Sequence, residues 1–411
     1  MRQILIIVIY FLISFEVFSV QDPSGPSGNC SPMLETPHRI TSLKSPFSFL
    51  VQRWIYMSNH PDVRWVNLLD NVPVWPDHSP LSSTLSMGPG AVQDYGSSLG
   101  NPQLIQAVAK RENVLYPINV TPQNVLITNG AIHALSLIFE KLIVPGKTVF
   151  CQAPVFQGVL KSIQQRLGKT HFFQAKDFRQ MAAELVSNGT IRDITMIYLN
   201  NPNNPTGELL SRQELEEIMA FARKYKIPLV VDQVYDSYNF TSTPMTHALA
   251  LSADWENIFI VNSMSKNYGA PGLRIGWVIS APKEIESLAG ILESKVVTVS
   301  GPSQTYATQL INDGNRALVE STAKGRELIY EALKAIPDIQ YDLPEGGVQF
   351  FIKLPVSDIE DFADFFMLRY HVCLTTVANY AGVEGAFVRI PFGLKSEIVI
   401  EGLTKLKDGL A

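Results

Sequence analysis

The stretch NIFIVNSMSKNYGAPGLRIGWVIS, residues 257–280, decides the fold that the sequence predicts. It begins with a near-continuous apolar run, NIFIVN, which is typical of a strand whose two sheet faces are both covered by helices. A second run, LRIGWVIS (273–280), predicts another strand, and the polar and glycine-rich residues between the runs predict a loop. Open α/β sheets bind ligands where a buried strand leads into such a loop.

Lys266 lies in this loop, directly after the first strand, with Ser263 and Ser265 before it. A lysine amine forms an imine with a carbonyl compound when burial or nearby positive charge lowers its pKa. Arg274 follows eight residues later, and its planar guanidinium suits a phosphate, to which the serine hydroxyls could also donate. An exposed lysine in an ordinary loop gives the same short pattern. The prediction that Lys266 forms an imine therefore depends on the rest of the chain.

Outward from this stretch, short apolar runs alternate with amphipathic stretches from about residue 120, a pattern typical of βαβ units. Strands are predicted at 124–127, 147–151, 194–199 and 227–232, helices at 131–142, 211–225 and 303–333, and later strands in GGVQFFIKL and AFVRIPFG. We therefore expect an α/β fold with two domains. A large, mostly parallel-sheet domain spans 76–324, and a smaller α/β domain built from both chain ends combines 45–75 with 325–411.

Asp232 ends one of these strands and opens the segment DQVYDSY. A carboxylate at a buried strand end is costly unless it has a partner. The protonated ring nitrogen of a bound cofactor would be such a partner, since that proton makes the ring an electron sink. Tyr235 could donate its phenol hydrogen to an oxygen on the same ring. Asp236 is a weaker alternative to Asp232, and a carboxylate that only caps a turn would give the same pattern.

The loop NNPNNPTG, residues 200–207, also follows a predicted strand. Its prolines fix an irregular backbone, and its asparagine amides both donate and accept hydrogen bonds. We expect Asn204 to contact both cofactor and substrate. Phe156, in CQAPVFQG after the strand predicted at 147–151, could stack on a cofactor ring, although a core position fits a phenylalanine equally well.

The turn in TNGAIHAL, residues 128–135, opens onto a predicted helix. The first amides of a helix have no carbonyl partner within it and commonly bind phosphate. Gly130, Ala131 and Ile132 are the residues whose amides we expect to do so.

In these segments and their order, the chain resembles the class I/II aminotransferases, fold type I enzymes that use pyridoxal 5′-phosphate (PLP) and are similar to aspartate aminotransferase. The resemblance is carried by NPNNPTG, DQVY, SMSK and the arginine of GLRIGW, and it runs from about Val66 to the C-terminus. It implies that Lys266 holds PLP as a Schiff base and that Asp232 meets the ring nitrogen. Asn204 and Tyr235 would bind the ring oxygen.

The resemblance also places the cofactor phosphate against Ser263 and Arg274. Tyr95, in QDYGSSLGNPQL, resembles the tyrosine that reaches the phosphate of a partner subunit, which predicts a homodimer. Arg389, in VRIPFG, resembles the arginine that clamps the substrate α-carboxylate.

Three segments depart from the family pattern. NLLDNVP, residues 67–73, replaces a glycine-rich substrate segment, and Asp70 or Asn71 there could alter substrate contact. Gln349 stands where relatives often have an apolar residue. KVVTVSGPS lacks an arginine for a second carboxylate, which predicts that aspartate and glutamate are not the amino donors, unless Lys295 acts as a point charge. An Asp70 that faces the pocket would favour a cationic side chain such as arginine or lysine.

We therefore expect an aminotransferase that moves an amino group between an amino acid, not a dicarboxylic one, and a 2-oxo acid. Lys266, once freed, would take up the Cα proton and return a proton to the cofactor. An elimination, cyclisation or oxidation of an amino acid begins with the same steps and is the alternative. A non-catalytic secreted binding protein is a third interpretation, which the complete set of cofactor residues disfavours.

Composition and charge exclude other classes. The 411 residues are 46% hydrophobic, enough to bury a core, and the net charge of −5 gives no electrostatic case for nucleic acid. Cys30, Cys151 and Cys373 are too widely spaced for a zinc ribbon or a disulfide framework, although one distant disulfide stays open. We expect no bound metal.

The N-terminus differs from the rest of the chain, because a basic residue precedes an apolar run and a Pro/Gly/Ser-rich stretch follows it. This pattern predicts a signal peptide at 1–20, a linker at 21–44 and a secreted or periplasmic protein. An uncleaved membrane anchor and a buried helix in a cytoplasmic protein are the alternatives.

Overall fold

The structure, a computed structural model, describes residues 49–77, 80 and 90–410. The predicted signal peptide, the predicted linker and Cys30 lie outside these residues. The described residues all belong to one of the two units into which the chain divides, His38–Ala411. Among them, no helix combines the length and the apolar character that a membrane span requires.

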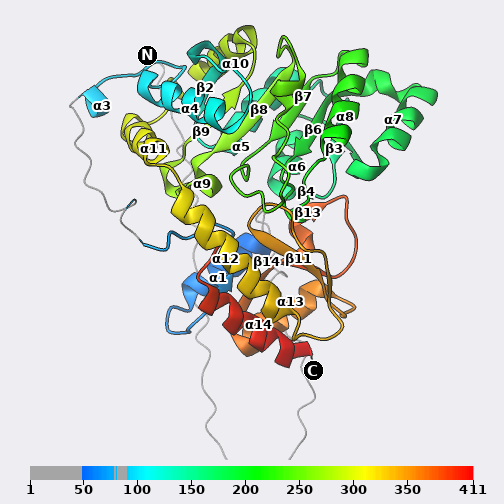
Figure 1. The fold of residues 1–411 in the computed structure, drawn as a ribbon. Coiled ribbons are helices and arrows are strands. Elements are labelled where there is room, and N and C mark those ends of the chain that lie inside the picture. Colours follow the sequence, from blue (N-terminus) through cyan, green and yellow to red (C-terminus); the bar gives the residue numbers. More distant parts are fainter. Residues whose placement is uncertain (1–48, 78–79, 81–89, 411) are drawn as a thin grey trace, which may run out of the picture. The chain divides into compact units, whose positions relative to one another are not determined.

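A seven-stranded sheet, in the order β2-β9-β8-β7-β6-β3-β5, forms the middle part of the chain (Figure 1). Its strands are β2 (Val125–Thr128), β3 (Thr148–Gln152), β5 (Lys169–Phe173), β6 (Ile194–Asn200), β7 (Leu229–Asp232), β8 (Ile258–Ser263) and β9 (Gly276–Ile279). The strands from β8 to β5 pair in parallel, whereas β9 is antiparallel to both of its neighbours. The prediction of a mostly parallel sheet is confirmed.

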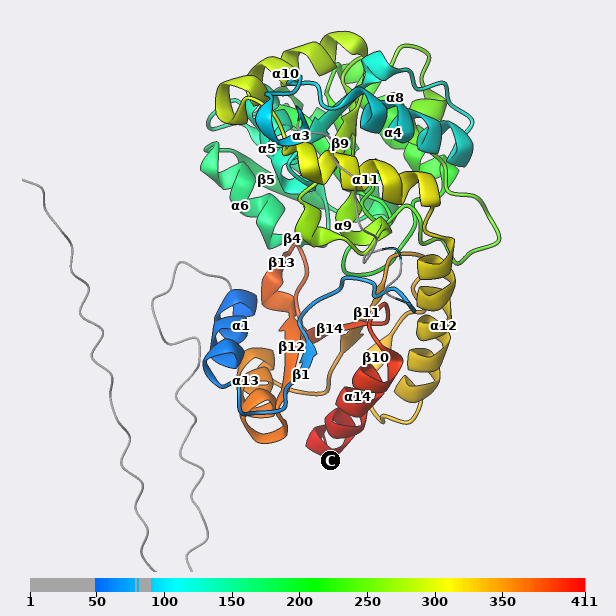
Figure 2. The same ribbon diagram turned by 90° about the vertical axis from the view of Figure 1, so that its left-hand side faces the viewer.

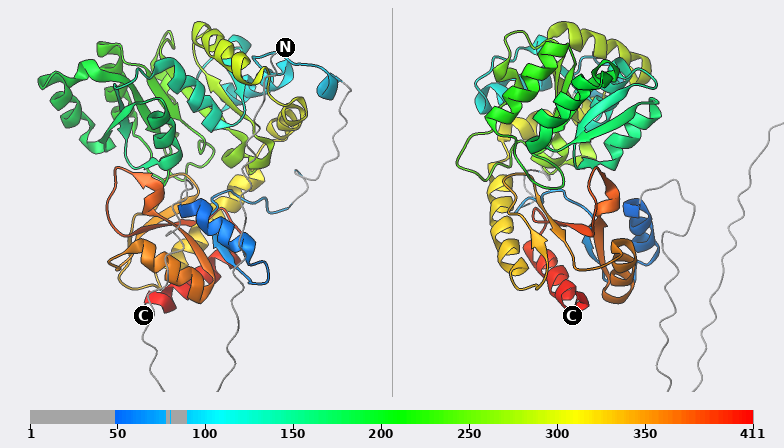
Figure 3. Two further views of the ribbon diagram at one scale, coloured as in Figure 1. Left: turned by 180° about the vertical axis from the view of Figure 1, so that it is seen from behind. Right: turned by 90° about the vertical axis from the view of Figure 1, so that its right-hand side faces the viewer.

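Helices cover both faces of this sheet, with α5 and α6 on one side and α4 and α8 on the other (Figures 2 and 3). The helices of this part are α3 (Gly90–Gln93), α4 (Pro102–Leu115), α5 (Ala131–Leu142), α6 (Gln157–Gln165), α7 (Phe178–Ser187), α8 (Arg212–Tyr225), α9 (Met264–Asn267), α10 (Pro282–Val296) and α11 (Gly301–Asp313). Ser211 and Glu214 form a capping box at the start of α8. The predicted helical stretch 303–333 is interrupted, because Gly314, at φ +80°, ends α11.

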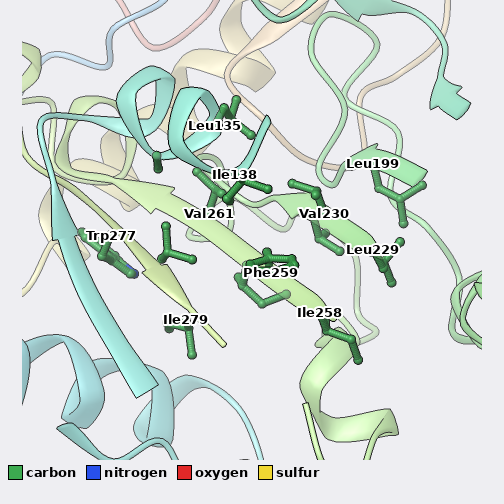
Figure 4. Close-up of a cluster of buried hydrophobic side chains, with 14 of the residues drawn as sticks. Leu135, Ile138, Leu199, Leu229, Val230, Ile258, Phe259, Val261, Trp277 and Ile279 are labelled. Atoms are coloured by element: carbon green, nitrogen blue, oxygen red, sulfur yellow. The ribbon is translucent and has the colours of Figure 1, made fainter. Parts of the chain in front are cut away.

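The core between these layers explains why the central strands carry no polar alternation. Every residue of β7 and β8 is buried. Figure 4 shows Val230, Phe259 and Val261 of these strands in one apolar cluster with Leu135 and Ile138 of α5. Apolar burial on both faces is the dominant stabilising contribution to such a sheet.

A second sheet has the order β1-β12-β14-β11-β10. Its strands are β1 (Val66–Leu68), β10 (Gln340–Tyr341), β11 (Gln349–Lys353), β12 (Val372–Thr376) and β14 (Phe387–Pro391), and its helices are α1 (Phe49–Asn59), α12 (Arg316–Leu333), α13 (Ile359–Tyr370) and α14 (Ser396–Leu410). The sheet lies between α12 and α13 (Figures 2 and 3). It contains strands from both chain ends, as expected, although the predicted boundary at residue 325 falls inside the continuous helix α12.

A two-stranded ladder links the segments that matter for the site. β4 (Val155–Phe156) pairs in antiparallel fashion with β13 (Tyr380–Ala381), with Phe156 opposite Tyr380. The loop after β3 is thereby fixed to the C-terminal part of the chain.

Candidate active site

The carboxyl ends of β6, β7 and β8 bring the predicted residues together. Asp232 is the last residue of β7 and lies between Asn200 of β6 and Val261 of β8 in the sheet register. Ser263 ends β8, and its hydroxyl accepts a hydrogen bond from the Ser265 N–H, which starts the single helical turn α9. Neighbouring strand ends in a parallel sheet form one edge, so these side chains face one site.

Lys266 lies on α9 with its amine buried. Its Nζ donates a hydrogen bond to Asn71 Oδ1 at 2.7 Å. Burial, followed by the positive charge of Arg389, lowers the pKa of this amine to about 7. Asp70 opposes this shift, and Arg274 adds a smaller lowering effect. Neutral amine and ammonium are therefore both populated near neutral pH, so the group can act as nucleophile and as proton acceptor.

Asp232 is held by two hydrogen bonds at the strand end. The Tyr198 hydroxyl donates to Oδ2 at 3.1 Å, and the Val234 N–H donates to Oδ1 at 3.3 Å. Burial raises the pKa of Asp232 to about 6, although both hydrogen bonds favour the carboxylate. A buried carboxylate with a raised pKa is stabilised by any cation that is placed against it.

The alternative residue, Asp236, belongs to a different network. Arg111 donates to both of its oxygens, at 2.6 and 3.0 Å, and Tyr116 and Asn267 also donate to it. This carboxylate already has a cation and a full set of donors. The structure therefore favours Asp232 over Asp236 as the partner of a ligand cation.

The glycine turn before α5 lies against Arg274. Gly130 has φ +83°, and a Cβ built on it would lie 2.6 Å from Arg274 Nη2. The Gly130 N–H donates to the Thr128 carbonyl at 2.9 Å, and phosphate binding by this amide stays a prediction. The amides of Ala131 and Ile132 start the helix, where no carbonyl within the helix is available to them. Together with Arg274, which lies against the same turn, these amides could hold an anion, and we call this group the anion cradle.

Arg389 is buried and bonded only to neutral groups. Its Nη1 donates to the Tyr380 hydroxyl at 3.0 Å, which in turn donates to Asn204 Oδ1 at 3.0 Å. Its Nη2 donates to the Leu69 carbonyl and, at 3.3 Å, to the Thr375 hydroxyl. Among the described residues, no carboxylate forms an ion pair with it. A buried guanidinium without a counter-ion strongly favours the binding of a carboxylate.

Two predicted residues stand apart from these contacts. Phe156 is half-buried, with its ring centroid 6.3 Å from that of Tyr380. Tyr95 is 85% exposed, and within the described part of the chain it forms no hydrogen bond with the site.

Lys295 forms an ion pair with Glu140 at 2.6 Å. Its ammonium is therefore already paired and does not replace the arginine that KVVTVSGPS lacks.

Sequence reasoning missed three side chains of the site: Asn71 as a partner of Lys266, Tyr380 as the bridge between Arg389 and Asn204, and Tyr198 as a donor to Asp232. Only Asn71 could have been noticed in the sequence, because it lies in NLLDNVP, a segment that departs from the family pattern. Tyr235 was predicted, and its hydroxyl accepts a hydrogen bond from Asn71 Nδ2 at 2.7 Å.

Gly130→Ala should weaken PLP binding by about tenfold or more, because the new Cβ would displace the Arg274 guanidinium from the turn. The measurement is the dissociation constant of PLP from the apoenzyme. Gly146→Ala is the matched control, since Gly146 has φ +81° and a Cβ added to it would meet nothing within 4 Å. Equal losses of affinity in both variants would mean that backbone strain alone is responsible and would contradict the cradle.

Lys266, Asp232 and Arg389 all lie within the match to a known protein family. The family described as aminotransferase class I and II matches residues 86–406. An L-aspartate:5-guanidino-3-methyl-2-oxopentanoate transaminase of Pseudomonas syringae pv. syringae is 34% identical over 376 residues, covering 91% of this chain and 96% of that protein. A 3-methylarginine biosynthesis aminotransferase of Streptomyces arginensis is 31% identical over 355 residues, covering 86% and 94%.

Solved structures agree on the fold. The aspartate aminotransferase of Thermotoga maritima superposes with a TM-score of 0.77 at 25% identity, covering 88% of this chain and 97% of that one. An archaeal alanine:glyoxylate aminotransferase superposes with a TM-score of 0.80 at 22% identity, covering 87% and 94%.

Proposed function

The chain belongs to the class I and II aminotransferases and uses PLP, and from this premise we propose that Lys266 is the residue that links the cofactor and moves the substrate proton. One observation carries the assignment. The Lys266 amine is buried, has a pKa lowered to about 7, and lies where Asn71, Tyr235 and the positive charge of Arg389 converge. A surface lysine would keep its ammonium and could serve neither purpose.

The described residues fit the polar parts of PLP. When bound, PLP supplies a carbonyl that forms an imine with amines and a ring that takes up the electron pair of a broken Cα–H bond. Asp232 would hold the protonated ring nitrogen, and Tyr235 would donate to the ring oxygen. The anion cradle formed by Ala131, Ile132 and Arg274 suits the phosphate. A Cβ on Gly130 would lie 2.6 Å from Arg274 Nη2 and displace that guanidinium.

The remaining groups act on the amino acid. Arg389 would bind the α-carboxylate through two parallel N–H donors, which fixes the orientation of Cα. Neutral Lys266 Nζ would then accept the Cα proton and later return a proton, as general base and general acid in turn. Asn204 and Tyr380 hold the Arg389 guanidinium in place for this.

We further propose that the substrate of this chain carries a guanidinium side chain, as an amino acid or as the corresponding 2-oxo acid. Two relatives above 30% identity are named for such compounds or for their pathway. Asp70 lies close enough to Lys266 to raise its pKa and is exposed, so it can meet a cationic side chain that enters the site. The 34%-identical relative is named for aspartate as donor, so the exclusion of dicarboxylic donors stays a prediction.

With single amino acids and no acceptor, arginine should react with the PLP enzyme with an apparent second-order rate constant about tenfold above that of leucine, and aspartate should be slower than either. One charge-assisted hydrogen bond to Asp70 accounts for a factor of this size. The measurement is the rate at which the cofactor absorbance changes for arginine, leucine, alanine, phenylalanine and aspartate.

Asp70→Ala should reduce the rate with arginine to about the rate with leucine, so that the preference for arginine is lost. Asp62→Ala is the control, since Asp62 is an exposed aspartate before the same strand β1. A preference for arginine that survives in Asp70→Ala would contradict the guanidinium site, and aspartate as the fastest donor would refute the dicarboxylate prediction.

We also propose a homodimer in which Tyr95 of each chain completes the other chain's phosphate site. The 85% exposure of this tyrosine supports a role outside its own chain. Mixed dimers of Tyr95→Phe and Lys266→Ala should then contain one intact site with wild-type affinity for PLP. If the active sites of mixed dimers keep the weakened affinity of Tyr95→Phe, the tyrosine acts within its own chain.

Export through an N-terminal signal peptide is the final proposal, and it rests on the sequence pattern of residues 1–20. The N-terminal sequence of the mature protein tests it. A mature chain that still begins at residue 1 or 2 would contradict cleavage.

A further inference from the structure

One buried amide contacts three residues of the site at once. Asn71 is 6% exposed and lies shortly after β1, in the segment that departs from the family pattern. Its Oδ1 accepts from Lys266 Nζ at 2.7 Å, and its Nδ2 donates to the Tyr235 hydroxyl at 2.7 Å and to Gln349 Oε1 at 3.3 Å. We propose that Asn71 is a positioning residue that fixes both the free amine of Lys266 and the direction in which Tyr235 donates.

The Lys266 amine is the first group that Asn71 positions. A Lys266 side chain that is not linked to the cofactor would be long and flexible, and fixing it would cost up to about 2 kcal/mol of rotamer entropy. The Asn71 carbonyl lies at hydrogen-bond distance from that amine. A neutral amine that donates one N–H to this carbonyl keeps its lone pair available for the Cα proton. Asn71 thus holds the base close to its reacting position.

Tyr235 is the second group, and its hydroxyl carries one hydrogen to donate. Because its oxygen accepts from Asn71 Nδ2, that hydrogen must donate to another group. The cofactor ring oxygen is the acceptor that the proposed function places there. Loss of the amide would let the hydroxyl rotate and donate elsewhere.

Gln349 supports the orientation of the Asn71 amide that the Lys266 amine requires. Its side chain is fully buried on β11, and its Oε1 accepts the remaining Asn71 N–H. A flipped amide would set two carbonyl oxygens against each other, which is unfavourable in a buried site. The two departures from the family pattern, in NLLDNVP and at position 349, are therefore one structural unit.

Two variants separate the two contacts. Asn71→Ala removes both of them and should slow Cα-proton transfer in a single turnover by about ten- to a hundredfold, with the dissociation constant of the amino acid little changed. Asn71→Asp is isosteric and still accepts from Lys266, but it can no longer donate to Tyr235. Its negative charge should shift the ascending limb of the pH–rate profile upward by about one unit or more.

The other charged groups that act on this amine are Arg389, Arg274 and Asp70, and all of them are unchanged in these variants. The isotope effect of Cα-deuterated substrate should rise toward its full value in Asn71→Ala, a response that a merely structural loss would not produce. Gln349→Leu should give a smaller effect of the same kind, and combining it with Asn71→Ala should add little. Asp62→Ala, at an exposed residue before β1, is the control and should behave as wild type.

The inference rests on the proposed role of Lys266, and the experiment distinguishes a failure of that role from a failure of the positioning role of Asn71. A wild-type enzyme that transfers no Cα proton to Lys266 would overturn that role. Wild-type proton transfer in Asn71→Ala, together with an unshifted pH profile in Asn71→Asp, would overturn only the positioning role of Asn71.

Discussion

Replacing Lys266 with alanine should lower the rate of transamination by about 10⁴-fold or more and remove the visible absorption band of the lysine–PLP link. The expected loss is large because one amine serves as both the nucleophile for the cofactor carbonyl and the proton acceptor for Cα. Its depressed pKa, about 7, suits both roles near neutral pH. The measurement combines the absorption spectrum with the rate of 2-oxo acid formation by the full-length chain.

Two controls make this result specific to the amine. A small primary amine added to Lys266→Ala should restore part of the proton transfer, which shows that the variant is folded. Lys266→Arg should stay inactive, since a guanidinium is not a nucleophile at neutral pH. Turnover in Lys266→Ala within tenfold of wild type, without added amine, would rule out the assignment.

Replacing Asp232 with asparagine should slow Cα deprotonation by about 10²- to 10³-fold and leave the fold intact. The amide is isosteric and keeps an oxygen for Tyr198 or Val234, so the strand end changes little. It carries no charge to stabilise a protonated ring nitrogen, and an unprotonated ring is a poorer acceptor of the Cα electron pair. The measurement is a single turnover with Cα-deuterated amino acid, in which deprotonation should become fully rate-limiting.

Asp236→Asn is the matched comparison, because it alters the other buried aspartate of the same segment. It breaks the ion pair with Arg111 and should lower Tm markedly. The rate of proton transfer at each site that still binds PLP should stay within about tenfold of wild type. If Asp236→Asn slowed proton transfer more than Asp232→Asn, the roles of the two carboxylates would be reversed.

Local patterns made much of the fold predictable. The apolar run 257–262 predicts β8 because parallel strands covered on both faces need no polar alternation. Ser211 and Glu214 predict the start of α8 because their side chains cap its first amides. Strands of only two residues, such as β10 and β13, carry too few side chains for any such period to be detected.

The site was predictable where its residues lie at the ends of strands or shortly after them. Asp232 ends β7, and Lys266 and Asn204 follow β8 and β6, so the sheet itself brings them together. Two of the residues that escaped prediction depend on contacts between distant segments. Asn71 is 195 positions from Lys266, and Tyr380 is 176 positions from Asn204.

The glycine turn before α5, which the sequence predicts to bind phosphate, shows a different limit. Its glycine and the helix that follows were predicted, but one turn can direct its amides in more than one way. Here the Gly130 N–H closes the turn onto Thr128, which leaves the next two amides for an anion. Hydrogen bonds inside a tight turn depend on φ and ψ, which residue types restrict but do not determine.

The most direct test of the central claim is a single half-reaction, with the PLP-loaded full-length chain, arginine and no amino acceptor. Transamination through Lys266 predicts one equivalent of 2-oxo acid and one of pyridoxamine phosphate per site, with no ammonia released. Ammonia release with PLP regenerated, or a product that retains the amino group, would show a different reaction on the same scaffold and would contradict the claim.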